Sequence, residues 1–96
     1  MKNDFDISEF VNTPTIQSIL VSLTDRVKDR RKEMKLSQKL LAQKSGVSYA
    51  SIRRFENTGE ISLISLLKIA KALNCLDDFN VLFGNKIITN LKDLDL

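Results

Sequence analysis

The sequence predicts an all-α fold, and three observations support this prediction. The 96 residues include one proline and three glycines, and 43% are hydrophobic, which suits one small helical domain with a single core. Apolar residues recur at three- and four-residue steps, the spacing of one helix face. The third observation is the stretch 37–56, SQKLLAQKSGVSYASIRRFE, which has the pattern of two short helices joined by a tight turn.

The first predicted helix is long and runs from about Pro14 to Met34. Thr13 supplies a capping hydroxyl, and proline suits the first helical position because an N–H there would have no partner in the helix. Residues 1–13 are polar and acidic, so we expect a flexible arm. The periodic apolar positions of the helix, which indicate one buried face, are Ile16, Ile19, Leu20, Leu23, Val27 and Met34.

The stretch 37–56 carries its caps and its glycine in the order that two helices and a turn require. Ser37 and Ser48 each stand where a hydroxyl can accept a bond from a first-turn N–H group. Gly46 separates the helices, since glycine tolerates the left-handed conformation that ends a helix. Ile52 and Phe55 are three residues apart, so they share the inward face of the second helix. The first helix contributes apolar Leu40 and Leu41 and the small Ala42.

The outward face of the second helix is basic. Segment 24–57 contains ten basic and four acidic residues, whereas 1–14 and 76–96 each carry a net charge of −2. The formal charge of the whole chain is only +3, so the positive charge is concentrated on this segment, as in a phosphate-binding surface. A short helix that presents small side chains, a tyrosine and arginines suits a DNA major groove. The residues on this face are Tyr49, Ala50, Arg53 and Arg54.

These features resemble the helix-turn-helix of the Xre family, the Cro and C1-type phage repressor-like DNA-binding domains. The matching features are LSQ at the start of the first helix, Ala42, the GVS turn, Ile52 and the FENTGEIS segment. The similarity extends from about Val27 to about Leu73. It implies a compact five-helix lambda-repressor-like domain, here with a long N-terminal helix and a short C-terminal tail. A helix-turn-helix can also be plain packing, but the arginine pair and the basic charge argue against that alternative.

The resemblance also implies roles for individual residues. An arginine at the position of Arg31 commonly pairs in the family with the glutamate that ends the reading helix, here Glu56. Gln38 is placed to meet a phosphate and to brace that helix. Arg30 stands where the family often has an apolar residue, and its stem is expected to lie along apolar surface with its head in solvent or at a phosphate.

The predicted DNA-binding residues form two groups, those expected to face bases and those expected to contact phosphates. Arg53 and Arg54 point about 100° apart, so one of them is expected to reach bases, and Arg53 is the expected guanine reader. Phosphate contacts position a protein without specifying sequence. The base-facing candidates are Tyr49, Ala50, Ser51 and Arg53, next to the cap Ser48; the phosphate candidates are Gln38, Lys39, Lys44, Arg54 and Asn57.

Two more helices are predicted after the stretch. Residues 57–61, NTGEI, have turn chemistry centred on Thr58 and Gly59, and Ser62 can cap the helix that follows. Its expected inward residues are Leu63, Leu66, Leu67, Ala70 and Leu73, and Asn74 ends it. A short fifth helix is expected from Asp77 to a stop at Gly84, with Phe79, Leu82 and Phe83 inward.

The predicted organisation is therefore an arm over 1–13, a DNA-binding domain over 14–84 and a tail over 85–96. The tail carries apolar Ile87, Ile88, Leu91, Leu94 and Leu96. Such a tail suits either packing back on the domain or a dimer or partner contact, and both alternatives stay open.

Composition also argues against other classes of protein. The chain has no histidine, the commonest general base and metal ligand, and its single Cys75 excludes an intrachain disulfide and a multi-cysteine zinc site. We therefore expect no enzyme activity, no cofactor and no metal, and a structural thiol at Cys75. The sequence shows no signal peptide and no bilayer-spanning apolar run, so a cytoplasmic protein without membrane contact is expected.

Two functional hypotheses follow. The first is a sequence-specific transcriptional regulator, a repressor that binds double-stranded DNA as a homodimer on a two-fold operator through the helix around 48–57. The second is an antitoxin that binds a toxin protein and autoregulates its own operon, because the same DNA-binding core is common in antitoxins. An adjacent toxin gene or co-purification with a second chain would distinguish them.

Overall fold

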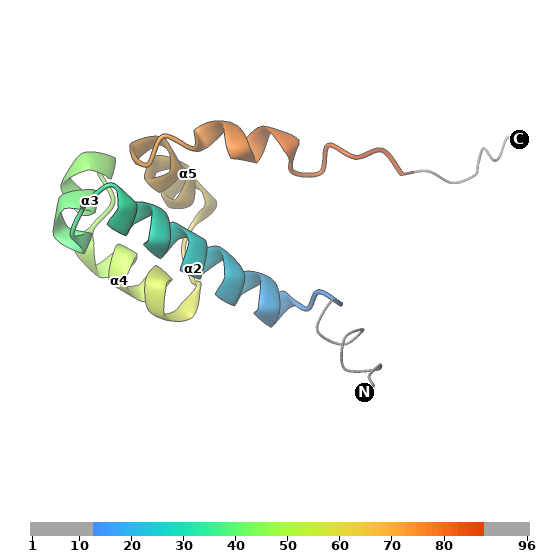
Figure 1. Ribbon diagram of the computed structural model, residues 1–96, viewed down its shortest axis with the longest axis horizontal. Coiled ribbons are helices and arrows are strands. Elements are labelled where there is room, and N and C mark those ends of the chain that lie inside the picture. Colours follow the sequence, from blue (N-terminus) through green and yellow to red (C-terminus); the bar gives the residue numbers. More distant parts are fainter. Residues whose placement is uncertain (1–12, 88–96) are drawn as a thin grey trace, which may run out of the picture.

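The computed structural model describes residues 13–87, and every element within that range is helical. The elements are α2 (Ile16–Glu33), α3 (Gln38–Ser45), α4 (Tyr49–Thr58), α5 (Leu63–Ala72) and a 3₁₀ helix η1 (Leu76–Val81). In Figure 1, α2 crosses the molecule, with α3 at the C-terminal end of α2 and α4 beside α2. The chain after η1 leads away from the helices. The predicted all-α class is confirmed.

The start of α2 differs from the prediction. Thr15, not Thr13, is the N-cap: its side chain accepts from the backbone N–H of Ser18 at 3.0 Å. The Ser18 hydroxyl oxygen in turn accepts from the Thr15 backbone N–H at 2.9 Å, which completes a capping box. Pro14 therefore precedes the helix and does not occupy its first position, because the reciprocal pair two residues further on satisfies more backbone groups.

The caps and turns around α3 and α4 are as predicted. Ser37 accepts from the Leu40 N–H and Ser48 from the Ser51 N–H, at 3.0 and 3.1 Å. Gly46 ends α3 with a φ of 78°, in the left-handed region. The predicted loop over 57–61 begins later than expected, because α4 continues to Thr58 and Gly59, with a φ of 83°, is its C-cap.

The core lies where α2, α3, α4 and α5 meet. Its fully buried large side chains are Leu41, Ile52, Phe55, Ile69 and Leu73. In α2, α3 and α5, four residues that were predicted to face inward are instead exposed: Ile16, Ile19, Leu40 and Leu63. Leu40 and Leu63 stand in the first turn of a short helix, and Ile16 and Ile19 stand at the start of α2, whose first buried residue is Thr24.

The last predicted helix is the least accurate part of the prediction. It is a 3₁₀ helix that begins one residue before Asp77 and ends before Gly84. Phe79 is half-buried as expected, but Leu82 is 56% exposed and Phe83 fully exposed. Phe83 also has a φ of 58°, which turns the chain outward after η1.

The predicted arm (1–13) and tail (85–96) fall almost wholly on residues 1–12 and 88–96, which lie outside the described residues. No helix among residues 13–87 is long and apolar enough to cross a bilayer. Within the same range, no three potential metal-ligating side chains are grouped together.

Candidate nucleic-acid interface

The inward face of helix α4 packs against the core, and this packing determines which side chains of the helix are exposed on its outward face. Ile52 and Phe55 are fully buried against the core. Tyr49, Ala50 and Arg53 are exposed on the other side of the helix. The structure thus brings these three predicted base-facing residues onto one surface.

A buried polar network joins α4 to α2 and α3. The Arg31 guanidinium donates to both carboxylate oxygens of Glu56, through Nε at 2.8 Å and Nη2 at 3.0 Å. Its Nη1 also donates to the Leu36 carbonyl at 2.9 Å. Gln38 Nε2 donates to Glu56 Oε1 at 2.8 Å. One carboxylate at the end of α4 is therefore held by side chains from two other helices.

This network fixes the position of α4 more than it stabilises the fold. The Glu56 side chain is 2% exposed and that of Arg31 10%, so both charges have lost most of their hydration. A buried pair offsets that cost only with good geometry and further hydrogen bonds, and here the pair is bidentate with two additional donors or acceptors. The predicted Arg31–Glu56 pair is present, as is the bracing contact of Gln38.

Tyr49 organises the cations of the outward face. The Lys39 ammonium lies 5.5 Å from the centre of the Tyr49 ring, and the Arg53 guanidinium carbon lies 5.6 Å from it. Cations at this distance from an aromatic ring are attracted by its face. The ring therefore contacts one cation from α3 and one from α4.

Arg54 is occupied by a carboxylate that the sequence reasoning missed. Its Nε donates to Glu60 Oε1 at 3.0 Å, and its Nη2 contacts the same oxygen. The left-handed turn at Gly59 brings Glu60 back beside the helix, and the Thr58 hydroxyl accepts from the Glu60 N–H at 3.1 Å. An acidic residue directly after a predicted Thr-Gly helix stop was the available signal for this pair.

The remaining candidates lie around this surface. Ser48 and Ser51 stand at the start of α4, where their hydroxyls are hydrogen-bonded to each other at 2.8 Å. Lys44 is exposed in the last turn of α3, and Asn57 is exposed in the last turn of α4 rather than in a loop.

Arg30, the residue before Arg31 on α2, has a structural partner at the end of α5. Its Nη1 donates to the carbonyl of Leu73 at 3.2 Å, and its Nε lies 3.9 Å from Glu33. Leu73 is the C-cap of α5, where backbone carbonyls lack helical partners. The head of Arg30 thus ties α2 to the end of α5. Sequence patterns could not predict this partner, because it is a backbone carbonyl 43 residues away along the chain.

The geometry defines a helix-turn-helix that exposes a basic, partly aromatic helix face. A family model described as "Helix-turn-helix" matches residues 27–78, more than half of the chain. The protein belongs to this family, the Xre, Cro and C1-type helix-turn-helix proteins. Searches of curated proteins and of solved structures gave no significant match.

Membership of the family defines the class of activity. The chain is a DNA-binding transcription regulator of the Xre type, and its family consists of DNA-binding regulatory domains rather than catalytic ones. The match begins at Val27 and ends at Asp78. It therefore leaves out the first half of α2 and the chain after the middle of η1.

Proposed function

We propose that the protein is a sequence-specific repressor that acts as a dimer on a two-fold operator, with α4 in the major groove. The supporting observation is the outward face of α4, where Tyr49, Ala50 and Arg53 are exposed on a helix whose inward face is fixed by buried contacts. A rigid helix with small and basic side chains outward can approach base edges closely.

The proposed contacts follow from position on the helix. Arg53, with Ala50 and Ser51, faces bases, and Arg53 donates to the O6 and N7 acceptors of a guanine. Tyr49 contacts a base or sugar edge while its ring holds Lys39 and Arg53 in place. Phosphates are met at the rim of the surface by Gln38, Lys39, Lys44, Ser48, Arg54 and Asn57.

Two of these residues have a competing partner. Gln38 keeps its amide N–H on Glu56, so a phosphate would be met by its remaining N–H. Arg54 is shared with Glu60 and would exchange part of that exposed pair for a phosphate.

Dimeric action follows from the size of the reading element. Helix α4 has 10 residues and offers few base-facing side chains, so one copy reads only a short half-site. Two copies related by a two-fold axis would read half-sites about 34 Å apart. The whole site is then a palindrome.

Selection of bound duplexes from a random pool tests this proposal. We expect an enriched palindrome whose half-sites are one helical turn apart, and lower transcription from a promoter that contains it. An enriched single half-site, or no enrichment over random DNA, would contradict the dimeric reading. Unchanged or increased transcription at a bound promoter would contradict repression.

The antitoxin hypothesis is a second candidate, favoured by exposed apolar side chains outside the family match. Ile16, Val81, Phe83 and Ile87 are all largely exposed, and a toxin could cover them. Expression with the neighbouring genes and purification of the tagged chain tests this. A stoichiometric second protein whose toxicity is neutralised would favour the antitoxin, whereas purification of the chain by itself favours the plain repressor.

A further inference from the structure

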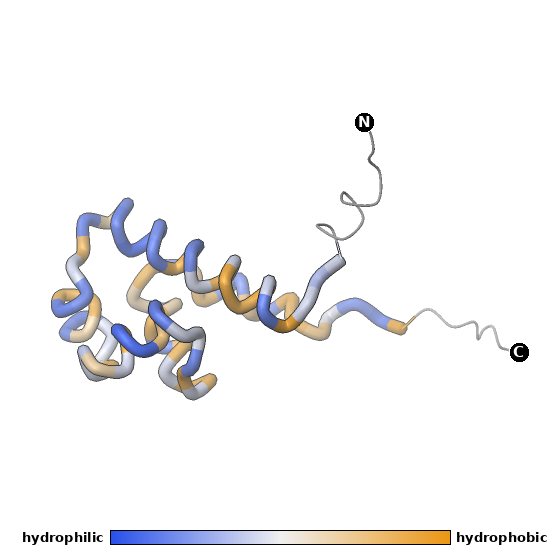
Figure 2. The backbone as a smooth tube through the Cα atoms, turned by 90° about the horizontal axis from the view of Figure 1, so that it is seen from below, coloured by the Kyte–Doolittle hydropathy of each residue, from blue (hydrophilic) through white to orange (hydrophobic). Residues whose placement is uncertain are grey.

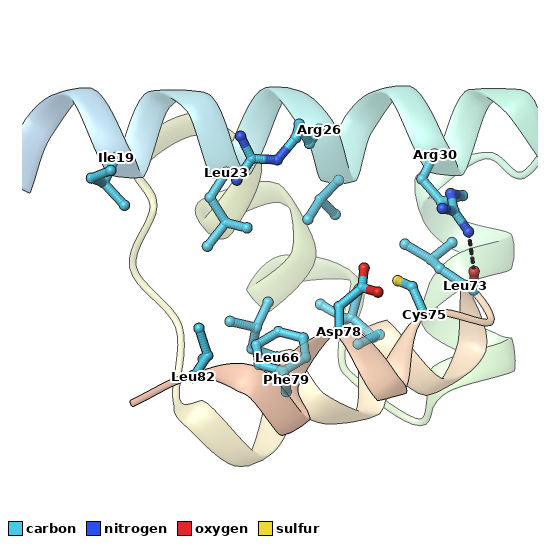
Figure 3. A pocket seen from close by; sticks show the side chains of 13 residues that line it. Ile19, Leu23, Arg26, Arg30, Leu66, Leu73, Cys75, Asp78, Phe79 and Leu82 are labelled. Carbon is cyan, nitrogen blue, oxygen red and sulfur yellow. Dashed lines mark hydrogen bonds between the residues drawn. The ribbon is translucent and has the colours of Figure 1, made fainter. Parts of the chain in front are cut away.

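An apolar groove lies on the side of the molecule away from the contact between α2 and α4. Its volume is about 360 Å³, and apolar side chains from α2, α5 and η1 line most of it. Figure 3 shows Ile19 and Leu82 at one end of the groove. Arg30, with its bond to the Leu73 carbonyl, lies at the other. The apolar lining includes Ile19, Leu23, Leu66, Ile69, Phe79 and Leu82.

The chain that leaves η1 is apolar and exposed. Val81 is 73% exposed, Phe83 fully so and Ile87 86%, on a segment of seven residues. At the start of α2, Ile16 and Ile19 are also exposed, and Ile19 lines the groove at the same end as Leu82. In Figure 2 both hydrophobic regions lie at the same end of the molecule. A monomer rarely exposes a contiguous apolar surface of more than a few hundred Å² without a partner for it.

The segment does not fill the groove of its own chain. The Gly84 N–H donates to the Val81 carbonyl at 2.9 Å, and Phe83 has a φ of 58°, which together make a tight turn after η1. A Cβ at Gly84 would lie 2.9 Å from that carbonyl, so the turn suits glycine. Beyond it, residues 85–87 lead away from the helices (Figure 1). Only Leu82, before the turn, contributes to the groove.

We infer that residues 83–87 of one copy pack into the α2–α5–η1 groove of a second copy, and that the exchange is reciprocal. A protruding apolar segment and an apolar groove on the same chain are complementary surfaces, and a two-fold axis uses both twice. Each copy then contributes several hundred Å² of apolar surface, so the interface is on the order of 1,000 Å², the size that a specific dimer requires.

The inference rests on the proposed dimeric function and names its interface. The protruding segment lies wholly after the family match, which ends at Asp78, whereas most residues that line the groove lie within the match. Both surfaces are separate from the outward face of α4. The same contact therefore leaves Tyr49, Ala50 and Arg53 free for DNA.

Sedimentation of the full chain without DNA tests the interface. Phe83→Asp removes a side chain that is fully exposed in one copy, so the fold should persist. We expect self-association to weaken by about tenfold or more, toward a 10.9 kDa monomer. Ile64→Asp is the matched control, because Ile64 is exposed on α5 but does not line the groove. Unchanged association of Phe83→Asp, or equal weakening by Ile64→Asp, would overturn the inference.

The single cysteine permits a direct measure of the exchange. Cys75 lines the groove, so Asn85→Cys should give an oxidised dimer linked between Cys75 of one copy and position 85 of the other. Oxidation is best done at alkaline pH, because burial raises the pKa of the Cys75 thiol. The same variant with Cys75→Ser should lose the cross-link. A cross-linked dimer that persists without Cys75, or an oxidised monomer, would overturn the exchange.

Other occupants of the groove predict different outcomes. Removal of residues 1–12 or of residues 88–96 should leave association and cross-linking intact. If either truncation abolishes association while Phe83→Asp does not, that terminal segment is the occupant and the inference is wrong. These measurements contain no DNA, so a dimer that selects no operator would contradict the repressor proposal and leave the interface standing.

Discussion

The surface of the helix-turn-helix (α3 and α4) differs from the surface of the periphery, by which we mean the start of α2 and the chain after η1. Around α3 and α4, the large apolar side chains other than Leu40 and Tyr49 are buried and the buried charges of Arg31 and Glu56 are paired, so that the exposed face is mainly basic. At the start of α2 and after η1, large apolar side chains meet solvent instead. Both regions belong to one small chain, which therefore has two chemically different surfaces: a basic one on the DNA-binding helix-turn-helix and an apolar one on its periphery.

The comparison also concerns the use of charge. The buried Arg31–Glu56 pair holds α2, α3 and α4 in one arrangement. The exposed Arg54–Glu60 pair lies at the rim of the DNA-binding surface and holds only a local turn. The same kind of arginine–glutamate pair therefore holds three helices together where it is buried and holds only a local turn where it is exposed.

Breaking the buried pair should have the largest effect. Glu56→Ala leaves the Arg31 guanidinium buried without its carboxylate, which costs about 3–5 kcal/mol of unfolding free energy. Glu60→Ala, its exposed counterpart, should cost about 0–1 kcal/mol. Chemical denaturation of both variants measures the difference. Similar costs for the two would show that burial does not distinguish the pairs.

The double variant Arg31→Met with Glu56→Leu refines that measurement. Because no charge is left buried, we expect it to recover most of the lost stability. DNA binding should remain weak, since the bracing contacts of Gln38 and Leu36 also depend on these side chains. Full recovery of operator affinity would show that the network does not position α4.

Substitutions at the two glycines with left-handed backbone should distinguish the cost of backbone strain from the cost of steric crowding. At Gly46 an added Cβ meets nothing within 4 Å, so Gly46→Ala costs only the left-handed strain, about 1–2 kcal/mol. At Gly59 a Cβ would lie 3.2 Å from Leu20 Cδ2 of α2, so Gly59→Ala should cost more. Thermal melts of both variants test the order. A larger loss of stability for Gly46→Ala than for Gly59→Ala would mean that the Leu20 side chain moves aside at little cost.

Arg53 and Arg54 should separate sequence reading from positioning. Arg53→Ala should lose about 1–3 kcal/mol of discrimination for the operator and little affinity for random DNA. Arg54→Ala, the matched control on the adjacent residue, should weaken both kinds of DNA slightly and equally, because Arg54 is already paired with Glu60. Titrations of operator and random duplexes measure both. An equal loss on the two duplexes for Arg53→Ala would make Arg53 a phosphate contact.

Local chemistry explains which parts of the fold were predictable. The caps Ser37 and Ser48 and the turn at Gly46 depend on a few adjacent residues, and all three are confirmed. The start of α2 was placed at Thr13 because proline follows it, but Thr15 has Ser18 as a reciprocal partner. A check for the capping box would have decided between the two threonines.

Contacts between distant residues explain the errors. Leu63 fits the periodic pattern of α5 but is exposed, whereas Ile69, Ala70 and Ala72 are buried, because the neighbouring helices determine which side of α5 is covered. Phe83 was placed inward by its apolar character, but its φ of 58° turns the chain away from the helices. Periodicity predicts that a helix has an apolar face, but it does not determine which residues of that face the neighbouring helices bury.

The smallest expected change in stability comes from removing an N-cap, and one cap from the periphery can be compared with one from the helix-turn-helix. Thr15→Ala and Ser37→Ala each remove a hydroxyl that accepts from a first-turn N–H at 3.0 Å. An N-cap contributes about 1 kcal/mol when its helix end is coupled to the fold, which holds for Ser37, because Leu41 one turn later is fully buried.

The first turn of α2 has no such anchor, since its first buried residue is Thr24. Thr15→Ala should therefore let this turn fray, with a loss of global stability below about 0.5 kcal/mol. Hydrogen exchange should quicken near residues 18–20 in that variant, while the melting curve stays close to wild type. If residues 83–87 of a second copy cover this turn, the loss should grow with protein concentration, because the dimer couples the turn to a buried interface. A concentration-independent loss as large as that of Ser37→Ala would show instead that the start of α2 is already anchored within one copy.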